Sequence, residues 1–273
     1  MNVFSTALAF SALLAACTAP APEAAPTPAP APGADPHADL LAAAGPPAHV
    51  VRDIGFLVYD GVNDLDLFGP RYVLGQYLGA RAHLIALDTG RVATVMGVEI
   101  APTTTVAQVD SLDVLVVPGG FAGTIAATYD TALHAWIRRV DATTLYTAAV
   151  CTGGHILAAT GLLEGRGATT NWYRAEEKLA RYGARFTDDR WHRDGKYWTS
   201  AGVTAGMDMS LALLADLWSE PYAQGVMLDM EYDPDPPFAG GSPEATPPAI
   251  YRGMRGMYDA GFAATERALG VRE

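Results

Sequence analysis

One cysteine of this 273-residue chain lies where a nucleophile could be placed. Cys151 follows the apolar run from Leu145 to Val150 and precedes Thr152-Gly153-Gly154, which predicts a sharp turn from a buried strand into a helix. Such a turn exposes one side chain at the end of a strand. Since the positive end of a helix dipole favours a thiolate, we expect a lowered thiol pKa and a nucleophilic Cys151. The alternative is a buried structural cysteine.

Two further features could serve the same site. Gly119 and Gly120 follow the apolar strand at Val114–Val117, and their backbone N–H groups suit an oxyanion or thiolate pocket, although Pro-Gly-Gly is also an ordinary turn. Asp66 follows the first predicted strand by a few residues. A carboxyl group in apolar surroundings has a raised pKa and can donate a proton. The alternative for Asp66 is helix capping, for which Asp64 is the rival residue.

Other kinds of chemistry find no support in the sequence. His155 lies four residues after Cys151 on the predicted helix, so we expect it to face the core or the back of the turn and to be a poor general base. The chain has no Cys/His cluster with metal-ligand spacing, no Gly-rich phosphate loop and no Gly-x-Ser-x-Gly motif. We therefore expect neither a metal ion nor an organic cofactor.

The composition excludes one class of partner and allows a large core. The formal net charge is −12 with a pI near 4.8, and no run of Lys or Arg offsets it, so nucleic-acid binding is disfavoured. Hydrophobic residues make up 50% of the chain, which is enough for a sizeable core. The only two cysteines, Cys17 and Cys151, each have a separate explanation, so we expect no structural disulfide.

The elements that must position these residues alternate between strand and helix. Strands are predicted at 53–59, 82–87, 114–117, 144–150 and 197–200, and helices at 64–79, 131–140, 152–160, 175–182, 206–218 and 250–269. Several of the strands are apolar on both faces, which indicates a mostly parallel sheet covered by helices on both sides. Residues 233–248 are rich in Pro and Gly and are predicted to form a loop or arm. The sequence thus predicts a single α/β domain over residues 49–273.

The amino-terminal segment has the pattern of an export signal. The apolar run from Val3 to Ala16 is too short to span a bilayer and fits a signal peptide over residues 1–16. Its end, Leu14-Ala15-Ala16-Cys17, resembles a bacterial lipobox, which implies that Cys17 is lipidated. No Lys or Arg precedes the run, so an ordinary cleaved signal peptide or a misassigned start codon are the alternatives.

The segment after the apolar run is rich in Ala and Pro. Residues 17–48 are predicted to form an extended linker, because repeated X-Pro steps cannot build a packed core. We expect a protein of the bacterial cell envelope, lipid-anchored and facing the periplasm or else exported. It would touch the membrane only through the lipid.

The chain resembles the DJ-1/PfpI superfamily and, within it, the isonitrile hydratases. The matching stretches are Ile54-Gly55-Phe56-Leu57, Leu65-Asp66-Leu67-Phe68-Gly69-Pro70, Val117-Pro118-Gly119-Gly120, Val150-Cys151-Thr152-Gly153, Ala168-Thr169-Thr170, Gly202-Val203-Thr204-Ala205-Gly206-Met207-Asp208, Glu231-Tyr232, Pro236-Pro237-Phe238 and Gly241-Ser242-Pro243. The resemblance implies a flavodoxin-like, class I glutamine amidotransferase-like domain. It also implies a small-molecule substrate and a homodimer.

The resemblance assigns a role to each matching site residue. It implies that Cys151 is the nucleophile, Asp66 the acid/base partner and Thr152 a supporting residue. It also implies that Gly119 and Gly120 line the substrate pocket through their backbone. The main-chain amide of Val203 would approach the thiolate. The implied reaction is attack of the thiolate on the isonitrile carbon, followed by release of an N-substituted formamide by water.

Some residues depart from the pattern of this subgroup. Asn171 stands where His is usual, and Phe68 and Gly154 also differ from the commoner residues. These changes leave open a glyoxalase- or deglycase-like activity on another small electrophile. A non-enzymatic lipoprotein that senses oxidants or binds ligands through its thiol is the third hypothesis. Thr152, rather than His, follows the cysteine, which argues against a PfpI-like protease.

Overall fold

The computed structural model describes residues 37–271 of the chain. Contacts divide the chain into two compact units, Met1–Ala38 and Asp39–Glu273, and the fold described below is that of the second unit. The predicted signal peptide, the predicted lipidation site Cys17 and most of the predicted linker lie outside the described residues. Within residues 37–271, no helix combines the length and the apolar character needed to cross a bilayer.

The core is built on a seven-stranded sheet in the order β10-β11-β7-β6-β1-β2-β5. Two further pairs, β3 with β4 and β8 with β9, lie outside this sheet. The strands of the described chain are β1 (Asp53–Leu57), β2 (Arg81–Ala86), β3 (Val92–Ala93), β4 (Glu99–Ile100), β5 (Thr104–Thr105), β6 (Val114–Val117), β7 (Tyr146–Val150), β8 (Gly167–Ala168), β9 (Arg185–Phe186), β10 (Trp191–Asp194) and β11 (Tyr197–Ser200). All pairs in the large sheet are parallel except β10 with β11. The predicted α/β domain with a mostly parallel sheet is confirmed.

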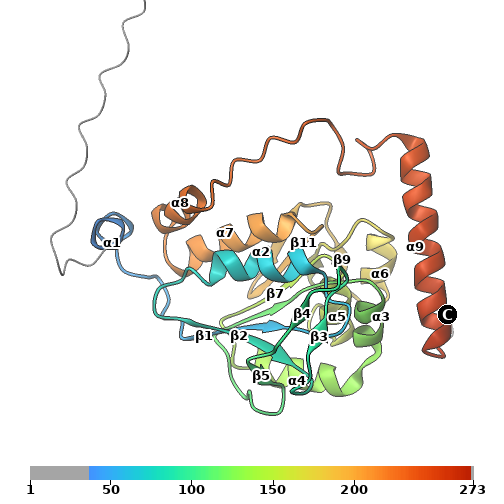
Figure 1. Cartoon of the computed structure of the whole chain (residues 1–273), viewed down its shortest axis with the longest axis horizontal. Coiled ribbons are helices and arrows are strands. Elements are labelled where there is room, and N and C mark those ends of the chain that lie inside the picture. Colours follow the sequence, from blue (N-terminus) through green and yellow to red (C-terminus); the bar gives the residue numbers. More distant parts are fainter. Residues whose placement is uncertain (1–36, 272–273) are drawn as a thin grey trace, which may run out of the picture. The chain divides into compact units, whose positions relative to one another are not determined.

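Helices surround this sheet (Figure 1). They are α1 (Ala38–Ala44), α2 (Asp64–Leu74), α3 (Ala122–Tyr129), α4 (Thr131–Asp141), α5 (Gly153–Ala159), α6 (Ala175–Ala180), α7 (Ala205–Leu217), α8 (Glu220–Asp229) and α9 (Pro248–Ala268). Helix α2 packs against α7, and α3 and α4 pack against α5. Helix α9 follows the predicted arm and contacts α3, so the end of the described chain returns to the side of the molecule that carries α5 (Figure 1).

Three helices differ from the sequence-based predictions, and the short strands β3, β4, β5, β8, β9 and β10 were not predicted. Helix α1 falls in the segment predicted to be extended, because Leu40 and Leu41 pack against the core and Ala44 is buried. Helices α3 and α8 were not predicted as helices. Helix α3 starts after Phe121 without a side-chain cap, and so lacks the usual sequence signal for a helix start.

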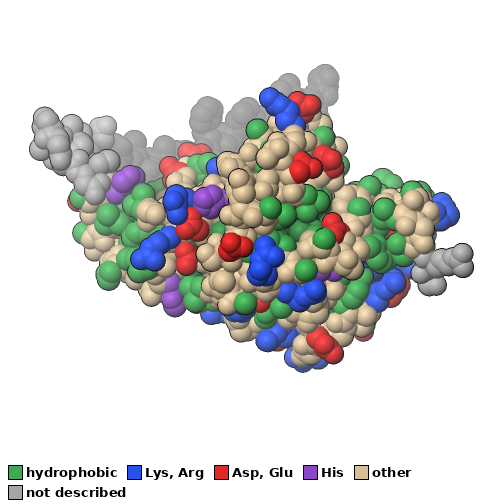
Figure 2. All heavy atoms as spheres, turned by 90° about the horizontal axis from the view of Figure 1, so that it is seen from below, with side chains coloured by type: hydrophobic (Ala, Val, Ile, Leu, Met, Phe, Trp, Pro, Cys, Tyr) green, Lys and Arg blue, Asp and Glu red, His purple; other side chains and the backbone are tan. Residues whose placement is uncertain are grey.

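The face shown in Figure 2 carries mixed charges. Lys and Arg side chains are scattered there among acidic and apolar ones and do not gather in one area.

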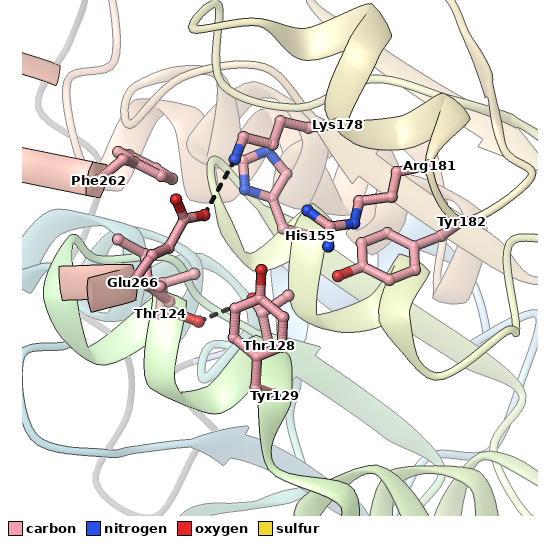
Figure 3. A pocket seen from close by; sticks show the side chains of 10 residues that line it. Thr124, Thr128, Tyr129, His155, Lys178, Arg181, Tyr182, Phe262 and Glu266 are labelled. Atoms are coloured by element: carbon pink, nitrogen blue, oxygen red, sulfur yellow. Dashed lines mark hydrogen bonds and ion pairs between the residues drawn. The ribbon is translucent and has the colours of Figure 1, made fainter. Parts of the chain in front are cut away.

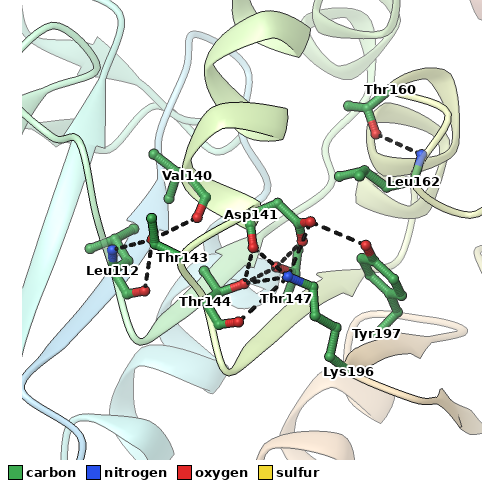
Figure 4. Close-up of polar contacts among 10 residues, drawn as sticks. All are labelled: Leu112, Val140, Asp141, Thr143, Thr144, Thr147, Thr160, Leu162, Lys196 and Tyr197. Atoms are coloured by element: carbon green, nitrogen blue, oxygen red, sulfur yellow. Dashed lines mark hydrogen bonds and ion pairs between the residues drawn. The ribbon is translucent and has the colours of Figure 1, made fainter.

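A buried polar cluster fixes the amino end of β7 (Figure 4). The Asp141 carboxylate, at the end of α4, accepts hydrogen bonds from Thr147 Oγ1 at 2.7 Å and from the Tyr197 hydroxyl at 3.1 Å. Lys196 Nζ lies 3.1 Å from the same carboxylate. One side chain thus joins α4, β7 and β11 at the end of β7 opposite Cys151.

We expect Asp141→Ala to destabilise the protein strongly. The substitution leaves an ammonium and two hydroxyls without their buried acceptor, and breaking a buried pair in this way costs roughly 3–5 kcal/mol. Urea unfolding would measure the loss. Glu99→Ala is the control, because the Arg91–Glu99 pair is 68% exposed on both sides and an exposed pair contributes only about 0–1 kcal/mol. Equal losses of stability in the two variants would contradict the stabilising role of the buried Asp141 cluster.

Candidate functional site

Cys151 occupies the turn between β7 and α5, as predicted. Its backbone has a positive φ of 55°, which is the strained geometry of a nucleophile elbow. Its N–H donates to the Ser200 carbonyl at 3.1 Å, and its carbonyl accepts from Thr170 Oγ1 at 2.7 Å. These bonds hold the thiol at the carboxyl end of β7, where the residue is 6% exposed.

Asp66 lies in the first turn of α2 and does not cap that helix. The cap is Asn63, whose side chain accepts hydrogen bonds from the N–H groups of Leu65 and Asp66. Asp64 instead accepts from Thr94 Oγ1 at 2.7 Å. The Asp66 side chain is therefore free to enter the interior, where it is fully buried.

The Asp66 carboxyl group lies beside the thiol but has few partners. Neither of its oxygens makes a well-formed hydrogen bond within the described part of the chain. Burial raises the pKa of Asp66 to about 7. The nearby Cys151 thiol and Gly119 N–H lower this pKa, but by less than burial raises it. The predicted rise is confirmed, and its cause is removal from water.

The predicted fall of the thiol pKa is wrong. Burial is the largest influence and raises the pKa of Cys151, and the neighbouring Asp66 raises it further. The Thr152 backbone N–H and the Asn171 amide lower it without compensating. Helix α5 has only seven residues, and its dipole does not outweigh the loss of water. At neutral pH the pair therefore holds a thiol beside an acid that titrates near 7.

The loop after β6 closes on the same side chains. Thr152 Oγ1 donates to the Gly120 carbonyl at 2.8 Å and accepts from the Gly120 N–H at 3.0 Å. A Cβ atom at Gly119 would lie 2.6 Å from Thr152 Oγ1 and 2.7 Å from Asp66 Oδ2. Only glycine fits at this position, because both contacts are shorter than real Cβ atoms make. The threonine thus ties the glycine loop to the elbow.

Gly119→Ala is expected to lower activity by roughly 100-fold, because a methyl group there displaces the carboxyl that faces the thiol. Overpacking of this kind also costs about 1–3 kcal/mol of stability. Steady-state rates and urea unfolding would measure the two effects. Gly253→Ala is a control for glycine loss, since nothing lies within 4 Å of its Cβ position and its φ is not positive. Full activity in Gly119→Ala would contradict the close approach.

Asn171 is the third polar side chain at the thiol. Its Nδ2 donates to Cys151 Sγ at 3.4 Å, and its Oδ1 accepts from the Tyr173 N–H at 3.0 Å. The residue is 4% exposed. Val203 lies in the turn from β11 to α7, at the carboxyl end of the strand that pairs with β7. The predicted site residues within the described part of the chain therefore lie together at the carboxyl ends of the parallel strands.

Two residues around this site were not predicted from the sequence. The buried Tyr59 hydroxyl donates to the Pro118 carbonyl at 2.8 Å and lies 2.9 Å from Thr124 Oγ1. Its position at the end of the first predicted strand was the available signal. Tyr258 of α9 packs its ring on Trp172 and Tyr173, which directly follow Asn171, and no local sequence signal marks it.

His155 is buried in the interior, as predicted. It lines a small cavity behind the elbow, of about 20 Å³, beside Thr124, Lys178 and Glu266 (Figure 3). Burial lowers the pKa of His155 to about 3, and its Nε2 has no protein partner within residues 37–271. A cavity of this size holds about one water molecule. A neutral, buried imidazole facing this cavity cannot act as the base for Cys151.

The chain is similar to known proteins of one family. The model of the DJ-1/PfpI family matches residues 52–216. An isonitrile hydratase of Pseudomonas putida is 41% identical over 197 residues, which cover 72% of this chain and 86% of that protein. The crystal structure of a ThiJ/PfpI family protein from Pseudomonas syringae has a TM-score of 0.78 at 35% identity and covers 88% of this chain and 97% of that one.

A more distant structure shares the fold alone. Drosophila melanogaster DJ-1beta has a TM-score of 0.61 at 23% identity, over 68% of this chain and all of that one. The chain belongs to the DJ-1/PfpI family.

Proposed function

We propose that this protein is an isonitrile hydratase that uses Cys151 as its nucleophile. The observation that carries the proposal is the Cys151 thiol beside the Asp66 carboxyl, whose pKa is raised to about 7. A carboxyl group with this pKa can both take and return a proton near neutral pH. The 41% identity to an isonitrile hydratase supports the choice of substrate.

The proposed first step uses the proton that the pair already holds. The Asp66 carboxylate takes the thiol proton as Sγ attacks the terminal carbon of the isonitrile and forms a C–S bond. Asp66 then returns this proton to the same carbon, which gives a neutral thioimidate. The Asn171 amide and the Thr152 N–H donate to the sulfur and stabilise its charge during the attack.

The proposed second step consumes one water molecule. Water adds to the thioimidate carbon while Asp66 accepts one of its protons and passes it to the nitrogen. As the C–S bond breaks, the added hydroxyl becomes the formamide carbonyl, and its proton passes through Asp66 to the departing sulfur. The net change is one isonitrile and one water converted to one N-substituted formamide, and the protein returns to its starting state.

The test is the formation of a formamide from a simple alkyl isonitrile, followed by NMR with purified protein. Methylglyoxal, assayed in parallel, distinguishes hydration from the glyoxalase-like alternative suggested by Asn171 and Phe68. Turnover of methylglyoxal alone would overturn the choice of substrate. No turnover of either compound, with a thiol that still reacts with peroxide, would favour the sensor hypothesis.

We also propose that the protein is exported and anchored through Cys17, and that it forms a homodimer. The apolar run ending in Leu14-Ala15-Ala16-Cys17 supports the first point, and the family resemblance supports the second. Labelling of cells with a palmitate analogue would detect the lipid, and Cys17→Ser would abolish the signal. Light scattering on the protein without its lipid would give the mass of the assembly. A wild-type protein without label would overturn the lipid anchor. A monomeric mass would overturn the homodimer.

A further inference from the structure

The cavity behind the elbow has an unpartnered polar group in its wall. His155, on α5, is 4% exposed, and its Nε2 is buried without a protein partner in the described part of the chain. A buried polar atom that makes no hydrogen bond costs free energy, so such an atom in the wall of a cavity indicates a bound group inside it. The cavity of about 20 Å³ has room for one atom or molecule of the size of water.

The side chains around this cavity carry more positive than negative charge. Lys178 of α6 and Arg181 at the end of that helix line it together with Glu266 of α9 (Figure 3). Lys178 Nζ lies 3.5 Å from the Glu266 carboxylate, and both side chains are mostly buried. The Arg181 guanidinium makes no hydrogen bond and no ion pair with any residue that the structure describes. One positive charge is therefore left over at the cavity, in a chain whose formal net charge is −12.

The imidazole itself is neutral, and its surroundings are positive. Burial lowers the pKa of His155 to about 3, and the charge of Lys178 contributes to this fall. A neutral imidazole can carry its proton on Nε2 and donate it in a hydrogen bond. A water molecule in the cavity accepts this hydrogen bond but leaves the charge of Arg181 unpaired. An anion accepts the hydrogen bond and offsets the charge as well.

We propose that this cavity is a binding site for a small monovalent anion such as chloride. The anion accepts a hydrogen bond from His155 Nε2 and faces the positive charges of Lys178 and Arg181. Bound there, it joins α5 to α6 behind the elbow, since the His155 N–H donates to the Thr152 carbonyl at 3.0 Å in the turn that follows Cys151. The anion site is separate from the thiol and does not depend on the proposed reaction.

Bromide tests the location of the site, because it has the charge of chloride and scatters X-rays anomalously. In crystals grown with sodium bromide, we expect an anomalous peak within hydrogen-bond distance of His155 Nε2. A water molecule in the cavity, without anomalous signal, would overturn the proposal. A bromide peak that persists there in His155→Phe would overturn it as well, since this variant keeps an aromatic ring but has no nitrogen.

The dependence of stability on chloride tests the site in solution. A ligand that binds only the folded protein raises the free energy of unfolding as its concentration passes the Kd. The urea midpoint of wild type should therefore rise when sodium chloride replaces sodium gluconate at constant ionic strength and pH, and a series of such mixtures gives the Kd. Equal midpoints in the two salts would contradict chloride binding.

Three variants separate this site from a general effect of salt. His155→Phe should raise the Kd for chloride by roughly tenfold or more, since a hydrogen bond to a charged group is lost. Arg181→Gln removes an exposed charge, leaves the Lys178–Glu266 pair intact and should raise the Kd by roughly two- to fivefold. Arg252→Gln is the matched control, because Arg252 is an exposed arginine that does not line the cavity. The same response to chloride in wild type and all three variants would overturn the proposal.

Discussion

Cys151→Ala is expected to lower isonitrile turnover by roughly 10⁴-fold or more, because the substitution removes the only group that can form the C–S bond in the proposed mechanism. Formamide production under single-turnover and steady-state conditions would measure this loss. Cys151→Ser should be almost as inactive. A hydroxyl is far less acidic than a thiol, and Asp66 with a pKa near 7 is too weak a base to activate it.

Cys17→Ser is the control for this experiment, since it removes the only other cysteine and leaves the elbow intact. It should hydrate at the wild-type rate in solution. Substantial turnover in Cys151→Ala, with an unfolding curve like that of wild type, would mean that the thiol is not the nucleophile.

Asp66→Asn is expected to lower hydration by roughly 10²–10⁴-fold while making the folded protein more stable at neutral pH. The pKa of the carboxyl is about 7 in the folded protein and near the usual value of roughly 3.9 in the unfolded chain. Between these values the folded state holds a proton that the unfolded state has released. The free energy of unfolding therefore falls as the pH rises from about 4 to about 7.

Asp66→Asn removes this pH-dependent loss of stability, because an asparagine side chain does not titrate. Its stability advantage over wild type should be small near pH 4 and grow to about 2–4 kcal/mol above pH 7. Urea unfolding at several pH values would measure it. Wild-type alkylation of Cys151 should rise with pH through about 7, as Asp66 loses its proton and becomes able to accept one.

Asp53→Asn is a control, because its effect on the free energy of unfolding should have the opposite sign at neutral pH. Burial acts to raise the pKa of Asp53, but hydrogen bonds from Arg81 and His83 outweigh it and leave the pKa lowered. That carboxylate therefore adds stability above about pH 4, which is lost as the pH falls. Asp53→Asn should destabilise the protein at neutral pH. The same pH trend in both variants would contradict the raised pKa of Asp66.

The chemistry at the strand ends could be predicted because its signals are local. An apolar strand followed by Cys151 and small residues predicts the elbow from consecutive residues alone. Asp66 was found by its place after the first strand, and Gly119 by its place after β6. Parallel strands bring such positions to one edge of the sheet, so the sequence is enough to group these residues.

What the sequence could not predict depends on burial and on distant parts of the chain. The prediction of a lowered thiol pKa was wrong, because it used only the helix that follows Cys151. The burial that raises this pKa depends on the whole fold. Asn63, not Asp64, caps α2, because Asp64 is engaged by Thr94, which lies thirty residues further along the chain. Tyr258 was missed because only the packing of α9 brings it against Trp172 and Tyr173.

The positive φ of Cys151 sets activity against stability at one position. Left-handed backbone costs a residue with a side chain roughly 1–2 kcal/mol, and glycine escapes this cost. A glycine at position 151 would therefore suit the turn better than the thiol does. Selection for yield or heat resistance alone would therefore favour this inactive variant. Engineering of the protein has to select for turnover at the same time.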